Sequence, residues 1–433
     1  MDTPTSPSRS LAATLAAIDA DRLWRSLMDL AALGATPRGG VCRLALTDLD
    51  RQARDLVTGW ARDAGCSVRV DAIGNVFARR PGSDPERLPV ATGSHIDTQP
   101  TGGKFDGNYG VLAGLEVLRT LNDAGVRTRS PLELCIWTNE EGSRFVPVMM
   151  GSGVYAGAFS LEHALNATDR GGTSVREALQ AIGYAGATPA AVADGAPRFG
   201  AYFEAHIEQG PVLENGGEVI GVVTGALGQR WFDVTVTGQE AHAGPTPMEL
   251  RRDALQAALP LMAAVRAIAL AEAPDARGTV GEVQVFPNSR NTIPGRVRFT
   301  VDLRHPNAEG LQRMEDALRV AIDAASKDTA RPGDIEVTLE RVVEFAPTPF
   351  DDTLVQRVQA AAASAGLPHR RLVSGAGHDA VYVARTAPAA MIFVPCKDGI
   401  SHNEVEDARP EHLAAGTQVL LQAMLETAGV DGA

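Results

Sequence analysis

Short apolar runs alternate with amphipathic segments along the first half of the chain. Residues 88–92, 132–138 and 201–207 are apolar runs of strand length, and residues 109–123 have the apolar spacing of a helix. Strands that alternate with helices predict a mostly parallel sheet with helices on both of its faces. In sheets of this kind, reactive side chains gather at the carboxyl ends of the strands.

The middle of the chain follows a different pattern. The segment RWFDVTVTG at 230–238 alternates between apolar and polar residues, which predicts a strand with one buried face. Further along we expect a helix at 253–273, strands at 279–286 and 296–305, a helix at 308–326 and a strand at 334–342. This β-α-β-β-α-β order is that of a split, ferredoxin-like unit.

A chain of 433 residues is too long for one ordinary hydrophobic core, so more than one domain is expected. After the ferredoxin-like unit, the α/β pattern resumes with an apolar strand at 390–395. We therefore expect an α/β domain built from residues 1–226 and 344–433, interrupted by an inserted α+β domain at 227–343.

The composition is that of a soluble globular protein, with 44% apolar and 21% charged residues. The formal net charge of −13 argues against a nucleic-acid partner, because phosphate binding needs a basic surface. The four cysteines are too widely spaced for a CxxC site, and Cys135 lies in an apolar stretch typical of a buried thiol. We see no signal peptide and no membrane span, and therefore expect a cytoplasmic protein without membrane contact.

Side chains that can bind metals follow several of the predicted strands. In the segment GSHIDTQPTGGKFDG, His95 and Asp97 are two residues apart and share one face of an extended chain. His95 is placed to bind a metal, and Asp97 to hold the imidazole from behind and fix its tautomer. Asp106 follows in a glycine-rich loop, whose glycines let the backbone bend sharply.

The segment TNEEGSRF places two carboxylates, Glu140 and Glu141, directly after an apolar strand. Adjacent side chains of an extended chain point in opposite directions, so one can bind a metal while its neighbour faces the substrate. A carboxylate in that position can act as a general base. His206 in HIEQGPVLE and His402 in SHNEVE also lie at the ends of apolar strands. Four such strand ends in one domain predict a metal site.

Two further motifs contain a histidine. AHAGPTPM carries His242 just after the first strand of the inserted domain, and SGAGHDA carries His378 and Asp379. The second motif also matches the spacing GxGxxA, but the preceding HRRLVS is too polar for the central strand of a dinucleotide-binding fold. The chain has neither a GxSxG elbow nor a GxxxxGKS/T loop, so serine-hydrolase and P-loop functions lack support.

Taken together, these motifs resemble the amidase, hydantoinase and carbamoylase branch of the aminoacylase and carboxypeptidase superfamily of co-catalytic metallohydrolases. The resemblance runs from about residue 54 to near the C-terminus. It implies a catalytic domain with two divalent metals, interrupted by a lid domain through which family members commonly form homodimers. The activity that it implies is hydrolysis of N-carbamoyl amino acids, α or β, to the amino acid, carbon dioxide and ammonia.

The resemblance also implies a set of metal ligands. His95, Asp106 and His206 would hold one metal. Asp106, Glu141 and His402 would hold the other, so that Asp106 would bridge the two. Three imidazoles and two carboxylates without a thiolate suit Zn²⁺, Mn²⁺, Co²⁺ or Ni²⁺.

Catalytic and substrate-binding roles are implied in the same way. Glu140 would be the catalytic base, and His242 would stabilise the developing oxyanion from the lid domain. Gln209, Asn291 and Arg304 match the substrate contacts of the family. The planar guanidinium of Arg304 would suit the carboxylate of the substrate.

Two other functions stay open at this point. Allantoate amidohydrolase applies the same chemistry to a substrate of purine degradation, although DTQPTGGKFDG and HAGPTPM are more similar to the enzymes that act on carbamoyl amino acids. A non-catalytic metal-binding or scaffold protein of the same fold would be expected to have lost Glu140 or one of the five ligand residues, and all of them are present.

Overall fold

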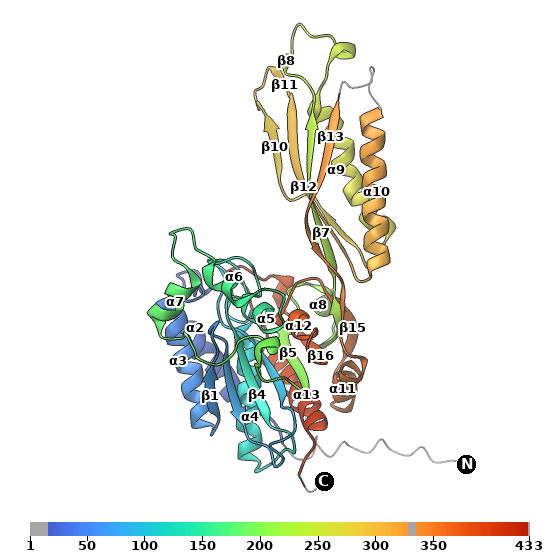
Figure 1. The fold of residues 1–433 in the computed structure, drawn as a ribbon. Coiled ribbons are helices and arrows are strands. Elements are labelled where there is room, and N and C mark those ends of the chain that lie inside the picture. Colours follow the sequence, from blue (N-terminus) through green and yellow to red (C-terminus); the bar gives the residue numbers. More distant parts are fainter. Residues whose placement is uncertain (1–15, 328–334, 432–433) are drawn as a thin grey trace, which may run out of the picture. The chain divides into compact units, whose positions relative to one another are not determined.

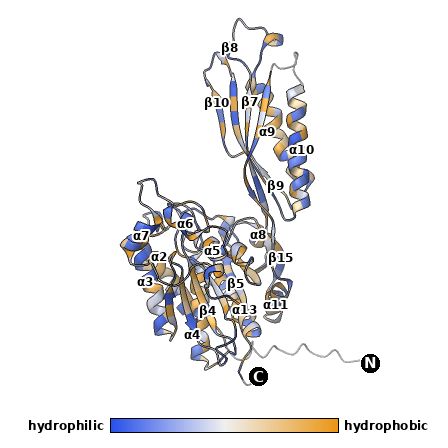
Figure 2. Cartoon of the chain, viewed as in Figure 1, coloured by the Kyte–Doolittle hydropathy of each residue, from blue (hydrophilic) through white to orange (hydrophobic). Residues whose placement is uncertain are grey.

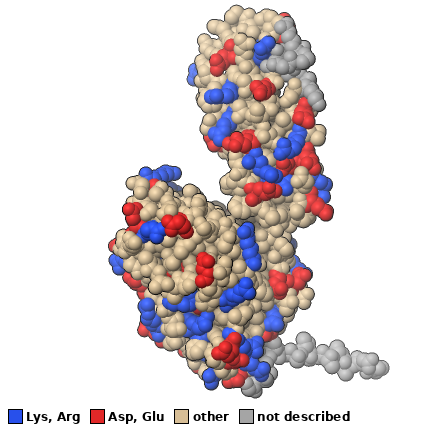
Figure 3. Space-filling model, in the orientation of Figure 1, with Lys and Arg blue, Asp and Glu red and all other residues tan. Residues whose placement is uncertain are grey.

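The computed structural model describes residues 16–327 and 335–431, and contacts within the chain divide it into two compact units. The larger unit consists of Met1–Gly225 and Phe350–Ala433, and the smaller unit of Ala226–Pro349. Each unit has its own hydrophobic core, and Figure 1 draws the helices and strands of both units. On the face drawn in Figure 3, acidic and basic side chains are interspersed on both units.

The larger unit is built on a mixed sheet with a parallel centre. Its strands lie in the order β1 (Ser67–Val70), β2 (Val76–Arg80), β4 (Leu132–Trp137), β3 (Val90–His95), β5 (Ala201–Ile207), β16 (Ala389–Val394) and β6 (Ile220–Ala226). Neighbouring strands from β4 to β16 are parallel, and the outer pairs are antiparallel. The predicted α/β fold with a mostly parallel central sheet is therefore confirmed.

The four central strands β3, β4, β5 and β16 are buried along their whole length. The run LELCIW in β4 is apolar apart from Glu133, and largely apolar runs are typical of parallel strands that are covered on both faces; Figure 2 shows β4 coloured mostly as hydrophobic. Gly93 in β3 is required for this close packing, because a Cβ atom there would collide with the backbone of Cys135 in β4. The predicted burial of Cys135 is confirmed.

Two groups of helices lie beside this sheet, in addition to α3 (Asp48–Asp63), which contacts β1 and β2, and α11 (Asp352–Ser364), which contacts β16. The first group comprises α2 (Ala20–Ala32), α4 (Asn108–Asp123) and α13 (Pro410–Ala428), which contact one another. The second comprises α5 (Met150–Tyr155) and α12 (Asp379–Val383), which pack together and against β4, β5 and β16. The HRRLVS segment forms β15 (His369–Ser374), which pairs with β6 outside the main order of strands.

The smaller unit has the predicted β-α-β-β-α-β order. Its main elements are β7 (Gly228–Thr237), α9 (Ala254–Ala271), β10 (Val283–Phe286), β12 (Arg296–His305), α10 (Ala308–Lys327) and β13 (Glu336–Phe345). The strands lie in the order β10-β12-β7-β13. Alternate residues of β7, namely Phe232, Val234 and Val236, are buried in a core shared with residues of α9 and α10. The inserted α+β architecture is therefore confirmed.

The strand predicted at 279–286 is interrupted in the structure. Its two ends form β9 (Arg277–Thr279) and β10, which pair with different parts of β12. Between them, the Thr300 hydroxyl accepts the backbone N–H of Glu282 at 3.0 Å. Gly281 lies in this gap, where a residue without a side chain weakens a strand.

Helix α9 is long and apolar enough, by length and composition alone, to cross a membrane, which the sequence did not lead us to expect. One such helix is weak evidence for a membrane span, because core helices of soluble proteins pass the same test. Both faces of the helix are mostly apolar, the one buried in the core and the one exposed to solvent. We call the exposed face the α9 outer face; it comprises Gln256, Leu259, Pro260, Ala263, Arg266, Ala267, Leu270 and Ala271.

Candidate active site

The predicted ligand residues of the larger unit meet at one edge of its sheet. His95 is the last residue of β3, His206 lies near the end of β5, and Glu141 follows β4. His402 follows β16, and Asp106 lies just before α4. Because the four central strands are parallel neighbours, their carboxyl ends lie at the same edge. Residues from five separate segments are thereby brought within a few ångströms of one another.

Asp106 lies at the centre of this cluster. Its Oδ1 atom is 3.2 Å from Nε2 of His206 and 3.7 Å from Nε2 of His95. Its Oδ2 atom is 3.2 Å from Nε2 of His402, which in turn lies 3.4 Å from Oε2 of Glu141. The cluster thus forms two groups of three potential metal ligands that share Asp106.

The ring orientation of two histidines fits a cation in the first group. Nδ1 of His95 lies 2.9 Å from the backbone carbonyl of Asp97, and Nδ1 of His206 lies 2.9 Å from the carbonyl of Ile207. A carbonyl can only accept, so each Nδ1 carries a proton. In a neutral ring Nε2 then turns its lone pair toward Asp106, so the contact needs either a proton on Nε2 or a cation between the two groups. Burial lowers the pKa of His206, but the hydrogen bond and charge of Asp106 outweigh this and raise it to about 9.

Asp97 acts on His95 differently from the way its sequence position suggested. The backbone carbonyl of Asp97 holds the ring, whereas its carboxylate oxygen Oδ1 is 3.8 Å from Nδ1. The carboxylate instead accepts the backbone N–H groups of Glu140 at 3.3 Å and Glu141 at 3.2 Å. The carbonyl of Asp97 therefore lies closer to the ring than its side chain does, and the carboxylate links the end of β3 to the loop after β4.

The loop after β4 holds Glu140 and Glu141 in place. Asn139 has a left-handed backbone with φ of 54°, and its side chain donates to the carbonyl of Phe145 at 2.8 Å. The carbonyl of Glu140 accepts the N–H of Met149 at 2.7 Å, which closes the loop. A strained residue beside reactive groups is a recurrent feature of functional sites.

The Glu140 carboxylate lies beside the ligand cluster, with Oε2 3.5 Å from Nε2 of His95. Burial, followed by the negative charges of Asp379 and Glu141, raises its pKa well above the usual range. In its ionised form, a carboxylate with a raised pKa is a stronger base than an ordinary one, which suits a general base. Glu141 is held separately by Gln99, whose backbone N–H donates to it at 3.1 Å and whose side chain donates at 2.6 Å.

Gln209, a predicted substrate contact, donates from Nε2 to Oδ2 of Asp106 at 3.0 Å. Two neighbours of Asp106 were not predicted as site residues. Ser401 lies 3.1 Å from Oδ2 of Asp106, and Glu406 accepts the backbone N–H of Asp106 at 3.2 Å. Both residues belong to the SHNEVE motif that carries His402, so this motif was the sequence signal that could have identified them.

A third residue missed by sequence reasoning supports the segment between His95 and Asp97. The Arg43 side chain is fully buried and donates from Nε to the carbonyl of Ile96 at 2.8 Å. It also donates to the side chain of Asn108, the first residue of α4, at 2.6 Å. Burial lowers its pKa to about 10. An isolated arginine in an apolar stretch gives no sequence signal for this role.

The remaining predicted site residues belong to the smaller unit. His242 lies in β8 (Ala241–His242) opposite Thr292 of β11 (Thr292–Ile293), and the carbonyl of Asn291 accepts the N–H of Ala243 at 2.8 Å. His242 and Asn291 therefore lie close together on this two-stranded ribbon. Arg304 in β12 forms an ion pair with Asp302, with Nη2 2.8 Å from Oδ2.

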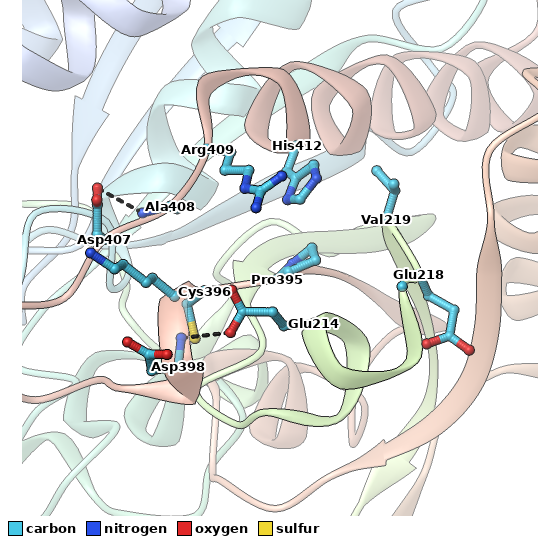
Figure 4. A pocket seen from close by; sticks show the side chains of 12 residues that line it. Glu214, Glu218, Val219, Pro395, Cys396, Asp398, Asp407, Ala408, Arg409 and His412 are labelled. Carbon is cyan, nitrogen blue, oxygen red and sulfur yellow. Dashed lines mark hydrogen bonds between the residues drawn. The ribbon is translucent and has the colours of Figure 1, made fainter.

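A cavity of about 630 Å³ in the larger unit contains none of the predicted site residues (Figure 4). It is lined by charged side chains of both signs, including Glu214, Lys397 and Arg409. Glu214 accepts the backbone N–H of Asp398 at 2.6 Å, which ties the cavity wall together. The cavity and the ligand cluster are thus distinct features of the larger unit.

Comparisons with known proteins agree with this geometry. The family model "Peptidase family M20/M25/M40" matches residues 91–426. The chain is 47% identical to N-carbamoyl-L-amino-acid amidohydrolase of Rhizobium meliloti, over 95% of this chain and 97% of that protein. It is 35% identical to allantoate amidohydrolase of Bacillus subtilis, over 92% and 95% of the two chains. The crystal structure of an amidase of the hydantoinase/carbamoylase family from Burkholderia multivorans superposes with a TM-score of 0.91 at 56% identity, over 95% and 98%. The chain therefore belongs to peptidase family M20/M25/M40.

Proposed function

We propose that the protein is a metal-dependent amidohydrolase that cleaves N-carbamoyl amino acids to the amino acid, carbon dioxide and ammonia. The observation that carries this proposal is the pair of ligand groups sharing Asp106, with Glu140 beside them. The substrate class is supported by the 47% identical relative from Rhizobium meliloti. The allantoate amidohydrolase of Bacillus subtilis is less similar at 35%, which makes allantoate the second candidate substrate.

The donor set fits two divalent cations. His95, Asp106 and His206 would hold one, and Asp106, Glu141 and His402 the other. Imidazole and carboxylate ligands without thiolate are compatible with zinc, manganese, cobalt or nickel. When bound, the metals would supply Lewis-acid polarisation of the ureido carbonyl and would acidify the attacking water.

Glu140 is the group of the chain that would move protons. Its carboxylate would accept a proton from the water as the water oxygen bonds to the ureido carbon. It would then deliver that proton to the nitrogen attached to the amino acid as the carbon–nitrogen bond breaks. The products are a free amino acid and carbamic acid, which decomposes to carbon dioxide and ammonia.

The neutral His242 ring has the tautomer that an oxyanion donor requires. Its Nδ1 atom accepts the backbone N–H of Gly244 at 3.1 Å, so the proton of the neutral ring lies on Nε2. That N–H is the group that would stabilise the oxyanion of the tetrahedral intermediate. Arg304 would pair with the substrate carboxylate in competition with Asp302, and Gln209 and Asn291 would complete the substrate contacts.

We also propose that the protein forms a homodimer through the smaller unit. The α9 outer face supports this, because it is exposed and carries only two polar residues, Gln256 and Arg266. Leu259 and Leu270 are 48% and 55% exposed, and exposed apolar patches of this kind mark interaction sites.

Replacing Leu259 with Glu should convert a dimer into monomers of 45.5 kDa, as measured by light scattering. The matched change Val320→Glu on α10, where Val320 is 67% exposed, should leave the dimer intact. A wild-type monomer would contradict the dimer proposal.

The substrate proposal is tested by ammonia release from N-carbamoyl-L-methionine, N-carbamoyl-β-alanine and allantoate under identical conditions. Turnover of a carbamoyl amino acid at a higher kcat/KM than allantoate is expected. Turnover of allantoate alone would keep the chemistry and assign the second candidate substrate. Failure of all three substrates would contradict the proposed activity.

A further inference from the structure

Glu406 is a buried carboxylate that the proposed mechanism does not use. It is 3% exposed and lies four residues after His402. Its Oε1 atom accepts two backbone N–H groups, from Phe105 at 2.9 Å and from Asp106 at 3.2 Å. Glu406 therefore fixes the backbone at the residue that is common to both ligand groups.

The second oxygen of Glu406 reaches the side chain of Asp106 through Ser401. The Ser401 hydroxyl lies 2.9 Å from Oε2 of Glu406 and 3.1 Å from Oδ2 of Asp106. Asp106 is thus held at both ends, by its backbone N–H and by its carboxylate. The same segment of chain that carries His402 provides both of these contacts.

The loop that carries Asp106 is shaped around the Glu406 carboxylate. A Cβ atom on Gly103 would collide with the carboxyl group of Glu406. Gly107, which follows Asp106, has a positive φ of 64°. A loop with several glycines does not fix its own conformation, so the position of Asp106 depends on contacts from outside the loop.

We infer that Glu406 is a positioning residue of the metal centre, which sets Asp106 so that its two oxygens face the two ligand groups. The inference rests on the proposed two-metal function. The geometry requires an oxygen that accepts two N–H groups and a second polar atom that engages Ser401. It does not require a negative charge at this position.

Four variants separate these requirements. Glu406→Ala removes both contacts. Ser401→Ala keeps the contact with the backbone and removes the link to the Asp106 carboxylate, together with the hydrogen bond that Gln209 donates to Ser401 at 3.2 Å. Glu406→Gln keeps an accepting oxygen and offers an N–H to Ser401, so it should rescue the site. Glu411→Ala, at an exposed position in the first turn of α13, is the control. Each metal-free variant is titrated with Co²⁺, and its visible absorption band and dissociation constant are measured together with its thermal unfolding.

Glu406→Ala is expected to bind Co²⁺ about 10- to 100-fold more weakly with a changed band, the usual cost of losing a group that orients a ligand. Ser401→Ala should show a smaller loss in the same direction, which tests the inference even if Glu406→Ala does not fold. Glu406→Gln and Glu411→Ala should match the wild type. Wild-type affinity and band in both alanine variants, or a Gln variant as weak as the Ala variant, would overturn the inference. A wild-type chain that binds no Co²⁺ would instead overturn the metal centre itself.

Discussion

Oδ1 of Asp106 and Nε2 of His206 lie 3.2 Å apart, so either a proton on Nε2 or a cation must lie between the two atoms, because with an ionised carboxylate and a neutral ring both would present lone pairs. Two facing lone pairs repel each other unless a proton or a cation lies between them. The same carboxylate meets His402 through its other oxygen at 3.2 Å. Asp106 is therefore the residue on which both halves of the proposed metal centre depend.

Asp106→Asn is expected to remove bound metal from both ligand groups, because an amide has only one oxygen and no charge. Metal analysis should fall from about two ions per chain to well below one. Asp407→Asn, an exposed neighbour of Glu406, serves as the control and should keep its metal. Full metal content in Asp106→Asn would show that the shared carboxylate is not a ligand.

Glu140→Gln is expected to reduce kcat by about 10²- to 10⁴-fold, the usual contribution of a positioned general base. Its metal content should stay at the wild-type level, because Glu140 belongs to neither ligand group. Glu162→Gln on α6 (Leu161–Asn166), whose side chain is 71% exposed, is the matched change and should be neutral. Near-normal turnover of Glu140→Gln would exclude Glu140 as the base.

His242→Ala is expected to lower kcat by about 10²- to 10³-fold, as the loss of one oxyanion donor does in other hydrolases. Metal content and the unfolding temperature should not change, because the exposed ring lies on a two-stranded ribbon of the smaller unit. The control is His163→Ala, another exposed histidine. A rise in KM with an unchanged kcat would instead assign His242 to substrate binding.

Thiol reactivity tests the packing of the larger unit. Burial raises the pKa of Cys66 to about 11 and that of Cys396 to about 12, and it holds the pKa of Cys135 well above its usual value. A raised pKa lowers the thiolate fraction at neutral pH, and only Cys42 is partly exposed. We therefore expect one of the four thiols to react with a disulfide reagent at about pH 8 in the native protein, and all four in denaturant. The Cys42→Ser variant should lose the native reaction, and rapid reaction of a second thiol would contradict the packing described.

The strand ends of the active site could be predicted from sequence because of how the central strands are buried. A strand covered on both faces is a largely apolar run, so the ligand-type residues at its end stand out. This is why His95, Glu140, Glu141 and His206 were identified before the fold was known. The break between β9 and β10 was missed, because Gly281 was too weak a signal to divide an otherwise regular strand.

Contacts made by backbone atoms could not be predicted in this way. The side chain of Glu406 accepts N–H groups from residues about 300 positions away, and no sequence pattern marks a backbone donor. The ring of His95 is likewise held by the carbonyl of Asp97 and not by its carboxylate. Arg43 reaches the same segment from an apolar stretch that gave no hint of function.

Stepwise metal restoration tests the central claim most directly. The protein is stripped with a chelator, and Mn²⁺, Zn²⁺, Co²⁺ or Ni²⁺ is added back in measured amounts while ammonia release from N-carbamoyl-L-methionine is followed. We expect no turnover in the stripped protein and recovery with at least one metal, saturating near about two equivalents per chain. Turnover that survives complete metal removal, or a protein that binds metal fully and still hydrolyses no ureido substrate, would contradict the account.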